Sequence, residues 1–221
     1  MIPQNKGLRE PQYLTPHLIR YRNPDVKLLI LLRNPVDRLY SDYYFIDNGE
    51  RSKNRTTFHQ AVVRAIDVLK KCQEHRSLRS CLFDFHLNAK LVKHKTRIQL
   101  GFNAVFLRDW LSVFPRDQIL IMRTEDYFAN TTSVMKRVFD FLQPLKEMEL
   151  TKFKITTSKR EYVTKHKLGK QPMMTKTKVM LENLYRPDIE ELSWLLKDER
   201  FLWKSIGIKN KIFRNSTINK R

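Results

Sequence analysis

The chain is poor in glycine, with five in 221 residues, and it contains no G-x-x-x-x-G-K-[ST] run. That run forms the phosphate-binding loop of NTP-using kinases, so its absence argues against this class. Long apolar stretches are also lacking, and no 18 consecutive uncharged apolar residues occur. We therefore expect no membrane-spanning segment in this sequence. No charged and then apolar signal peptide opens the chain, and the first residues, MIPQNKGLREPQYLTP, are typical of the interior of a protein.

Acidic residues are scarce relative to basic ones. The chain has 43 Lys and Arg against 23 Asp and Glu, which gives a net charge of +20 and a pI near 10.1. Such a field attracts polyanions, whether nucleic acid, an anionic membrane surface or a sulfated or carboxylated polysaccharide. The sequence carries no recognisable RNA- or DNA-binding motif. A basic, solvated surface without a polyanionic partner is the alternative.

Cysteine is scarce too, with only Cys72 and Cys81. Three Asn-X-Ser/Thr glycosylation sequons begin at Asn54, Asn130 and Asn215, which favours a secretory compartment. In such a compartment we expect a local Cys72–Cys81 disulfide. Free thiols are one alternative. A zinc site is another, because histidines lie nearby, but the C-x2-H-x5-C-x4-H spacing matches no standard zinc finger; we expect no metal.

Helical and extended patterns alternate along the chain. Residues 27–32 form a continuous apolar run, which is typical of a parallel strand covered on both faces, and a helix is expected over residues 36–45. A second buried strand is expected over residues 118–122, between helices near residues 101–115 and 130–142. The pattern predicts an α/β fold with a parallel sheet flanked by helices.

Other segments complete this outline. A capped helix is expected over residues 56–71, an irregular basic segment over 72–96, and two short helices around 175–185 and 188–196. The basic stretch 151–178 is too long for an inert connection and indicates a functional loop. We expect one domain over residues 1–204, closed by the FLW run, and a basic tail over residues 205–221.

Arg33 directly follows the first strand, and Ser41 lies eight residues further on, about two turns into the following helix. Ligands of open α/β sheets bind at the carboxyl ends of the strands. There a guanidinium holds a phosphate through two parallel hydrogen bonds, and a hydroxyl adds a donor to the same anion. The alternative is an Arg paired with Asp37 and a Ser on a solvated helix face.

The run LLRNPVDRLYSDYY resembles the 3′-phosphate-binding segment of the Golgi carbohydrate sulfotransferases, which use 3′-phosphoadenosine-5′-phosphosulfate. The resemblance implies that Arg33 and Ser41 hold the 3′-phosphate and that the fold is the P-loop-NTPase-like sulfotransferase fold. It extends over residues 25–204, with Glu125 matching a frequent acidic residue after the second strand. The RLYSDYY run and the RPDIEELSWLL and FLW runs look most like the N-acetylgalactosamine 4-sulfate 6-O-sulfotransferases, with the heparan sulfate enzymes next.

This resemblance implies sulfuryl transfer to a glycosaminoglycan, with an anionic polysaccharide as partner and no nucleic acid. The expected acceptor is the 6-position of N-acetylgalactosamine 4-sulfate in chondroitin or dermatan sulfate. Heparan sulfate is the alternative. The implied location is the Golgi lumen, within a type II membrane protein whose anchor precedes this sequence. Lys167, Gly169 and Lys170, in KHKLGKQP, fall where the heparan-type members of the family have a basic, Gly-containing segment that closes over the nucleotide.

Two parts of the family pattern are weak or lacking. The family holds the phosphosulfate on a Gly-containing loop with a catalytic Lys, after a first strand, but none of the five glycines here follows an apolar strand. We therefore expect an N-terminally truncated domain that does not turn over alone. Glu10 in REPQYLTP is the candidate base, although its spacing departs from the family pattern. A non-catalytic polyanion-binding module is the competing interpretation.

Overall fold

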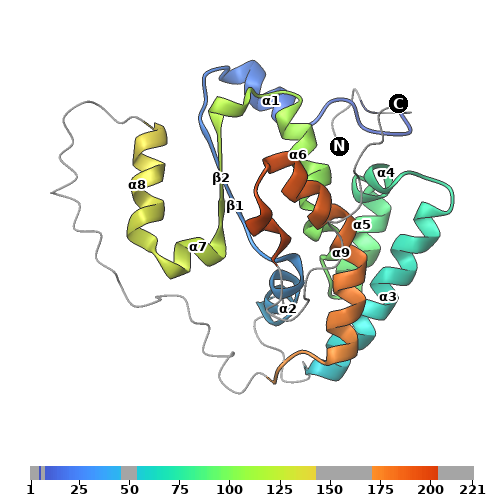
Figure 1. The fold of residues 1–221 in the computed structure, drawn as a ribbon. Coiled ribbons are helices and arrows are strands. Elements are labelled where there is room, and N and C mark those ends of the chain that lie inside the picture. The colour runs from blue at the N-terminus through green and yellow to red at the C-terminus, as the bar shows by residue number, and fades with distance from the viewer. Residues whose placement is uncertain (1–4, 6–7, 46–53, 143–170, 204–221) are drawn as a thin grey trace, which may run out of the picture.

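In the computed structural model of the chain, two strands lie side by side at the centre, with helices on both sides (Figure 1). The structure describes residues 5, 8–45, 54–142 and 171–203. Strand β1 (Leu28–Leu32) pairs in parallel with β2 (Ile119–Arg123), and Leu32 is the partner of Arg123. Both strands therefore end at one edge, as predicted for a parallel α/β sheet.

The helices that the structure describes follow one another along most of the chain. They are α1 (Thr15–Arg22), α2 (Pro35–Phe45), α3 (Arg55–Gln73), α4 (Leu78–Leu82), α5 (Phe85–Lys93), α6 (Asn103–Leu111), α7 (Thr124–Ala129), α8 (Thr131–Leu142) and α9 (Thr175–Leu196). Short 3-10 helices are η3 (Ile98–Gly101), η4 (Arg116–Gln118) and η6 (Glu199–Leu202). Within these ranges, no helix is both long and apolar enough to cross a bilayer.

The two faces of the sheet are covered unequally. One face packs against α6, α9 and η6 through a cluster that includes Leu107, Leu192 and Phe201. On the other face, α8 packs against β2 through a cluster of Met122, Val134 and Val138. Leu29 and Leu31 of β1 therefore remain 45% and 50% exposed, which is unusual for a parallel strand. A groove of about 350 Å³ runs along β1 beside α6.

A second core joins the helices beyond the sheet. Leu39 of α2, Phe58 of α3 and Tyr185 of α9 are almost fully buried in it, together with residues of α4, α5 and η3. The disulfide Cys72–Cys81 joins the end of α3 to α4, as expected from the sequence. This core fixes α2, and therefore the helix that follows β1, against α9.

Residues 72–96 were predicted to be irregular, and this prediction is wrong. The segment contains α4 and α5, whose first turns are capped by the side chains of Ser77 and Asp84. Leu87 and Leu91 of α5 are buried, so tertiary packing stabilises helices too short to form alone.

The two short helices predicted near the C-terminal end form a single helix, α9, which contains Pro187. Proline normally interrupts a helix because it lacks the backbone N–H and clashes with the preceding turn. Here Tyr185 and Leu192, on either side of the proline, are completely buried. The burial of both flanking turns outweighs the cost of Pro187, and the helix remains continuous.

Candidate functional site

The carboxyl edge of the sheet begins with Arg33, the first residue after β1. Arg33 is half-buried, and it forms no hydrogen bond or ion pair in the part of the chain that the structure describes. The alternative of an Arg33–Asp37 pair is therefore not observed. A partly desolvated guanidinium that retains all its donors is suited to an anionic ligand.

Asn34 connects this arginine to α2. Its side-chain Oδ1 accepts hydrogen bonds from the backbone N–H groups of Val36 (2.9 Å) and Asp37 (3.4 Å), and Pro35 occupies the first turn. These contacts cap α2 and start the helix immediately after Arg33. The N-terminus of this 11-residue helix thus lies two residues after Arg33 in the chain, and its dipole adds to the attraction for anions.

Ser41 lies on α2, six residues after Pro35, which corresponds to about 9 Å along the helix axis. It is half-buried and makes contacts within the protein. Arg38, on the same helix, is held by the protein itself: its Nη2 donates to the carbonyl of Arg97 (2.9 Å), and its Nη1 lies 3.5 Å from Asp42. Arg33 and Ser41 thus flank the first half of α2. Of the two arginines here, Arg38 is held by contacts within the protein, whereas Arg33 is not held in this way by any of the described residues.

The end of β2 adds a group of residues whose role was not recognised in the sequence. The Arg123 guanidinium lies 5.8 Å from the ring centroid of Trp203, and its Nε lies 3.8 Å from Oε2 of Glu125. Arg123 Nε, Glu125 Oε2 and Trp203 Nε1 are buried without a hydrogen-bond partner within the described part of the chain. Buried polar atoms without partners are rare, and they mark this edge as a polar site.

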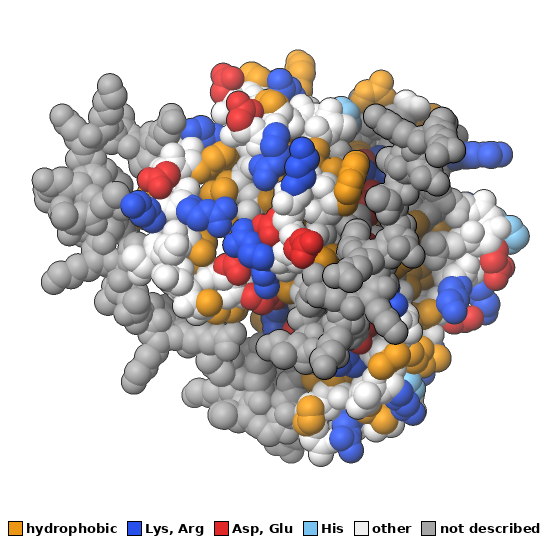
Figure 2. Space-filling model, viewed as in Figure 1, with side chains coloured by type: hydrophobic (Ala, Val, Ile, Leu, Met, Phe, Trp, Pro, Cys, Tyr) orange, Lys and Arg blue, Asp and Glu red, His pale blue; other side chains and the backbone are white. Residues whose placement is uncertain are grey.

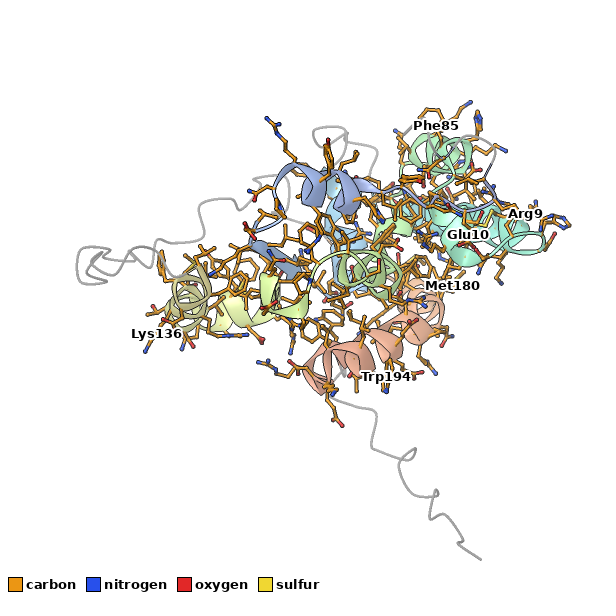
Figure 3. The ribbon with its side chains drawn as sticks, turned by 90° about the horizontal axis from the view of Figure 1, so that it is seen from above. Arg9, Glu10, Phe85, Lys136, Met180 and Trp194 are labelled. Atoms are coloured by element: carbon orange, nitrogen blue, oxygen red, sulfur yellow. A yellow bond between two sulfur atoms is a disulfide. The ribbon has the colours of Figure 1, made fainter. Side chains whose placement is uncertain are left out.

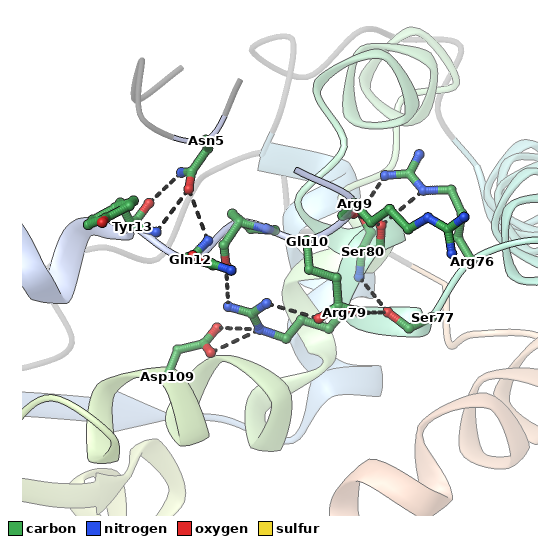
Figure 4. A network of polar contacts seen from close by, with 11 residues as sticks. Asn5, Arg9, Glu10, Gln12, Tyr13, Arg76, Ser77, Arg79, Ser80 and Asp109 are labelled. Carbon is green, nitrogen blue, oxygen red and sulfur yellow. Dashed lines mark hydrogen bonds and ion pairs between the residues drawn. The ribbon is translucent and has the colours of Figure 1, made fainter. Parts of the chain in front are cut away.

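Glu10, the candidate base, belongs to a polar network (Figure 4). Its carboxylate accepts hydrogen bonds from the Ser77 hydroxyl and from Arg79 Nη1 (3.1 Å), while Arg79 Nε donates to Asp109 (3.0 Å) and Arg79 Nη2 to the carbonyl of Pro11 (2.9 Å). The hydrogen bond from Ser77, with a further contribution from Arg79, lowers the pKa of Glu10. These contacts attach the N-terminal segment to α4 and α6.

The structure does not bring Glu10 to the carboxyl edge. Asp109 lies near the C-terminal end of α6, from which the chain enters β2 at its amino end. Glu10 and its partners therefore lie toward the amino ends of the strands, whereas Arg33 follows the carboxyl end of β1. Seen from above, Arg9 and Glu10 lie beside α3 and α4, with Lys136 of α8 at the opposite end of the molecule (Figure 3).

A cleft of about 700 Å³ lies beside this network, between α4, α6 and α9. Its charged lining residues are largely neutralised by one another, for example Arg108 with Glu191 (3.0 Å). Asp188 is buried there and accepts hydrogen bonds from the backbone N–H groups of Ala104 (3.1 Å) and Val105 (3.3 Å), which caps α6. Burial raises the pKa of Asp188 to about 6. An acidic residue on the buried side of α9 was the only sequence signal for this cap.

The remaining predicted residues fall into two groups. Lys167, Gly169, Lys170 and Asn215 lie outside the described residues. Asn54 and Asn130 are described; the Asn54 side chain accepts two hydrogen bonds from the first turn of the helix that follows it, and the Asn130 side chain accepts one from Ser133. Over the described ranges, no three His, Cys, Asp or Glu side chains are grouped so as to hold a metal ion.

The charge of the surface is mixed on the visible face. Figure 2 shows basic and acidic side chains next to one another across the centre of this face. The described residues include several ion pairs, such as Arg200 with Asp126 (3.3 Å) and Asp198 (2.7 Å). The unpaired Arg33 therefore differs from basic residues that already have acidic partners.

Comparisons with known proteins all point to sulfotransferases. Residues 2–184 match the sulfotransferase domain family. The chain is 37% identical over 201 residues to carbohydrate sulfotransferase 15 of Homo sapiens, which covers 89% of this chain and 34% of that protein. It is 30% identical over 139 residues to carbohydrate sulfotransferase 15 of Nototodarus sloanii, covering 61% of this chain and 84% of that one. The chain thus spans about a third of the human relative's length.

A solved structure supports the fold. A sulfotransferase from Alicyclobacillus acidocaldarius superimposes with a TM-score of 0.54 over 86% of this chain and 62% of that chain, at 21% identity. At this identity the likeness concerns the fold alone. It agrees with the helix-flanked parallel sheet described above.

Proposed function

The chain belongs to the sulfotransferase family, in its carbohydrate sulfotransferase branch, and we propose that it binds 3′-phosphoadenosine-5′-phosphosulfate for sulfuryl transfer to a glycosaminoglycan hydroxyl. The observation that carries the proposal is the half-buried Arg33, without a protein partner among the described residues, at the carboxyl end of β1 and beside the capped N-terminus of α2. This is the place where an open α/β sheet binds its ligand.

In this proposal Arg33 holds the nucleotide 3′-phosphate through charge-assisted hydrogen bonds, and the Ser41 hydroxyl adds one more donor. The partial positive charge at the start of α2 favours the same anion. Lys167, Gly169 and Lys170 close over the nucleotide, as the resemblance implies. The donor is a co-substrate, and the proposal requires no metal ion.

The acceptor is proposed to be chondroitin or dermatan sulfate, sulfated at the 6-position of N-acetylgalactosamine 4-sulfate. The net charge of +20 supports a polyanionic acceptor, because neutralising its charges releases bound counterions. Heparan sulfate is the competing acceptor. Transfer assays on desulfated and 4-sulfated chondroitin, with heparan as comparison, separate these possibilities.

Sulfuryl transfer requires an in-line donor, a base for the acceptor proton, and positive charge for the leaving phosphate. Glu10 remains the only base candidate from the sequence. Its contacts favour a structural role, because the carboxylate already accepts from Ser77 and Arg79 and its lowered pKa makes it a weaker base. We therefore do not assign the catalytic base to any residue.

We further propose that a strand outside the described residues pairs with the free edge of β1 and leads into the loop that holds the phosphosulfate. Two features support this. In the two-stranded sheet of the described residues, β1 has one unpaired edge. The groove beside it is lined by the whole of β1 and by apolar residues of α6, including Phe106 and Trp110. A parallel strand there would pair with the open backbone edge of β1, and the crossover helix that joins parallel strands would cover its exposed leucines.

The proposed location is the Golgi lumen, within a type II membrane protein anchored by a segment outside this sequence. The Cys72–Cys81 disulfide supports an oxidising compartment. Glycosylation at Asn54, Asn130 and Asn215 belongs to the same proposal.

Calorimetry with two nucleotides tests the proposed function. We expect 3′-phosphoadenosine 5′-phosphate to bind at least tenfold more tightly than adenosine 5′-phosphate, which lacks the 3′-phosphate. Equal affinities would contradict the proposal. The competing interpretation, a non-catalytic polyanion-binding module, is favoured by the lack of a glycine-containing loop after an apolar strand in this sequence. It predicts binding of heparin or chondroitin with no selective nucleotide binding.

A further inference from the structure

The turn that carries Arg33 is connected to the end of the neighbouring strand. The backbone N–H of Asn34 donates a hydrogen bond to Oε1 of Glu125, at 3.0 Å, across 91 residues of sequence. Beside it, the Thr124 hydroxyl donates to the carbonyl of Leu32, at 3.0 Å. Two hydrogen bonds thus join the start of α7 to the last residue of β1 and to the turn that follows it.

Asn34 is the residue through which this connection reaches the proposed phosphate site. It directly follows Arg33, and its side chain caps α2, the helix that carries Ser41. The position of the Asn34 backbone therefore sets the direction in which Arg33 leaves β1 and the position of the first turn of α2. We infer that Glu125 is a positioning residue for the 3′-phosphate site, which rests on the function proposed above.

The chemistry of Glu125 favours a positioning role over direct contact with the ligand. A carboxylate repels a phosphate, so its presence beside an anion site needs another reason. One oxygen, Oε1, is already used by Asn34. The other, Oε2, is buried and lies 3.8 Å from Arg123 Nε, which places a positive charge next to the carboxylate. Arg123 thus partly offsets the charge of Glu125, while Glu125 still accepts the hydrogen bond from the Asn34 turn.

Three variants separate this role from general stability. Glu125→Ala removes the acceptor, Glu125→Gln keeps an acceptor oxygen without the charge, and Asp126→Ala is the matched control. Asp126 is the next residue of α7 and pairs with Arg200 (3.3 Å) and Arg123 (3.7 Å), but no bond from it to the Asn34 turn is present in the described structure. The readout is the ratio of the Kd values for adenosine 5′-phosphate and 3′-phosphoadenosine 5′-phosphate, with thermal unfolding recorded for each variant.

We expect Glu125→Ala to lower this ratio by about tenfold or more, because the turn that positions Arg33 then loses its charge-assisted hydrogen bond. Glu125→Gln is expected to retain most of the ratio, and Asp126→Ala to leave it unchanged. The ratio compares two ligands on the same folded protein, so a loss of stability alone does not alter it.

Two results would overturn the inference: a wild-type ratio in Glu125→Ala, or a loss in Glu125→Gln as large as in Glu125→Ala. If the wild-type chain itself shows no preference for the 3′-phosphate, the proposed function fails and this role fails with it. A wild-type preference that is lost in Arg33→Ala but kept in Glu125→Ala rejects the positioning role alone.

Discussion

The ring of Tyr185 lies against Gly101 so closely that a β-carbon at this position would be 2.5 Å from ring atoms Cε1 and Cζ. Tyr185 is completely buried, and its hydroxyl donates to the carbonyl of Ile98, at 2.7 Å. Its ring also packs edge-on against Phe102, with centroids 5.2 Å apart. Gly101 therefore allows η3 and α9 to approach each other, and the tyrosine has no space into which it can move.

Gly101→Ala is expected to lower the free energy of unfolding by about 1–3 kcal/mol, the usual cost of overpacking a core. Denaturant unfolding measures it, with Leu100→Ala as the control. Leu100 is the neighbouring residue and is 43% exposed, so its truncation is expected to change stability by much less. An unchanged stability in Gly101→Ala would show that η3 and α9 separate easily.

Arg33→Ala is expected to weaken binding of 3′-phosphoadenosine 5′-phosphate by roughly 2–4 kcal/mol, because a partly buried charge-assisted contact is lost. Ser41→Ala is expected to cost about 1 kcal/mol. Calorimetry measures both, and Arg22→Ala, which removes an exposed arginine of α1, is the control. If both variants lose equal affinity for adenosine 5′-phosphate, the assignment of these residues to the 3′-phosphate is wrong.

The residues at the carboxyl edge of the sheet differ in how far the sequence predicts their positions. Both strands and the Arg33–Ser41 spacing are local patterns, since continuous apolar runs and the residues after them lie together in the chain. The contact between Asn34 and Glu125 joins residues 91 positions apart, and no periodicity encodes it. The same holds for Arg123 beneath Trp203, since FLW indicated only the closing of the core.

Contacts between distant residues also decide the helices that the sequence failed to predict. α4 and α5 were not predicted because each is short and depends on buried partners from α3. Pro187 indicated a break in α9 that the burial of Tyr185 and Leu192 prevents. Glu10 was considered as a base because REPQYLTP partly matches the family pattern, and the sequence does not reveal its partner Arg79, which lies 69 residues away.

The Cys72–Cys81 disulfide is expected to contribute on the order of 2–3 kcal/mol to stability by restricting the unfolded chain. Cys72→Ser combined with Cys81→Ser should lower the midpoint of denaturant unfolding accordingly. A reducing agent should have the same effect on the wild type and none on the double variant. Two alkylatable thiols in intact-mass measurements of secreted protein would contradict the pairing.

Asp188 gives a prediction of pH dependence. Burial raises the pKa of its carboxyl group to about 6 in the folded protein, so between about pH 4 and pH 6 the folded state binds more protons than the unfolded state. The contribution of Asp188 to stability is therefore largest at low pH and falls as the pH rises through this window, by on the order of 2–3 kcal/mol.

Asp188→Asn isolates this contribution, because the amide oxygen still accepts from Ala104 and Val105 but does not titrate. Three other carboxyl groups have lowered pKa values, namely Glu10, Asp84 and Asp198, mainly through hydrogen bonds from Ser77, Arg76 and Arg200. Their contribution to stability rises with pH, and it is the same in the wild type and in Asp188→Asn. The difference in unfolding free energy between the two proteins is the quantity to measure. A constant difference from pH 4 to pH 7 would show that Asp188 has an ordinary pKa.

The last prediction is that the 221-residue chain binds the nucleotide and a polyanionic acceptor but does not transfer sulfate. Binding follows from Arg33, Ser41 and the basic charge. Transfer additionally requires a fixed cation and backbone N–H groups at the leaving phosphate, and the loss of even one such donor typically lowers the rate about 10²–10³-fold.

None of the five glycines follows an apolar strand, and the edge of β1 that would neighbour such a loop is unpaired in the described sheet. Lysines elsewhere supply charge, but not a position fixed within ~0.5 Å. The measurement is transfer of labelled sulfate to chondroitin and heparan chains, by this chain and by a version extended upstream. Activity that appears only in the extended chain is the expected result. Clear transfer by the 221 residues would mean that other residues hold the phosphosulfate, and that the groove beside β1 needs no further strand.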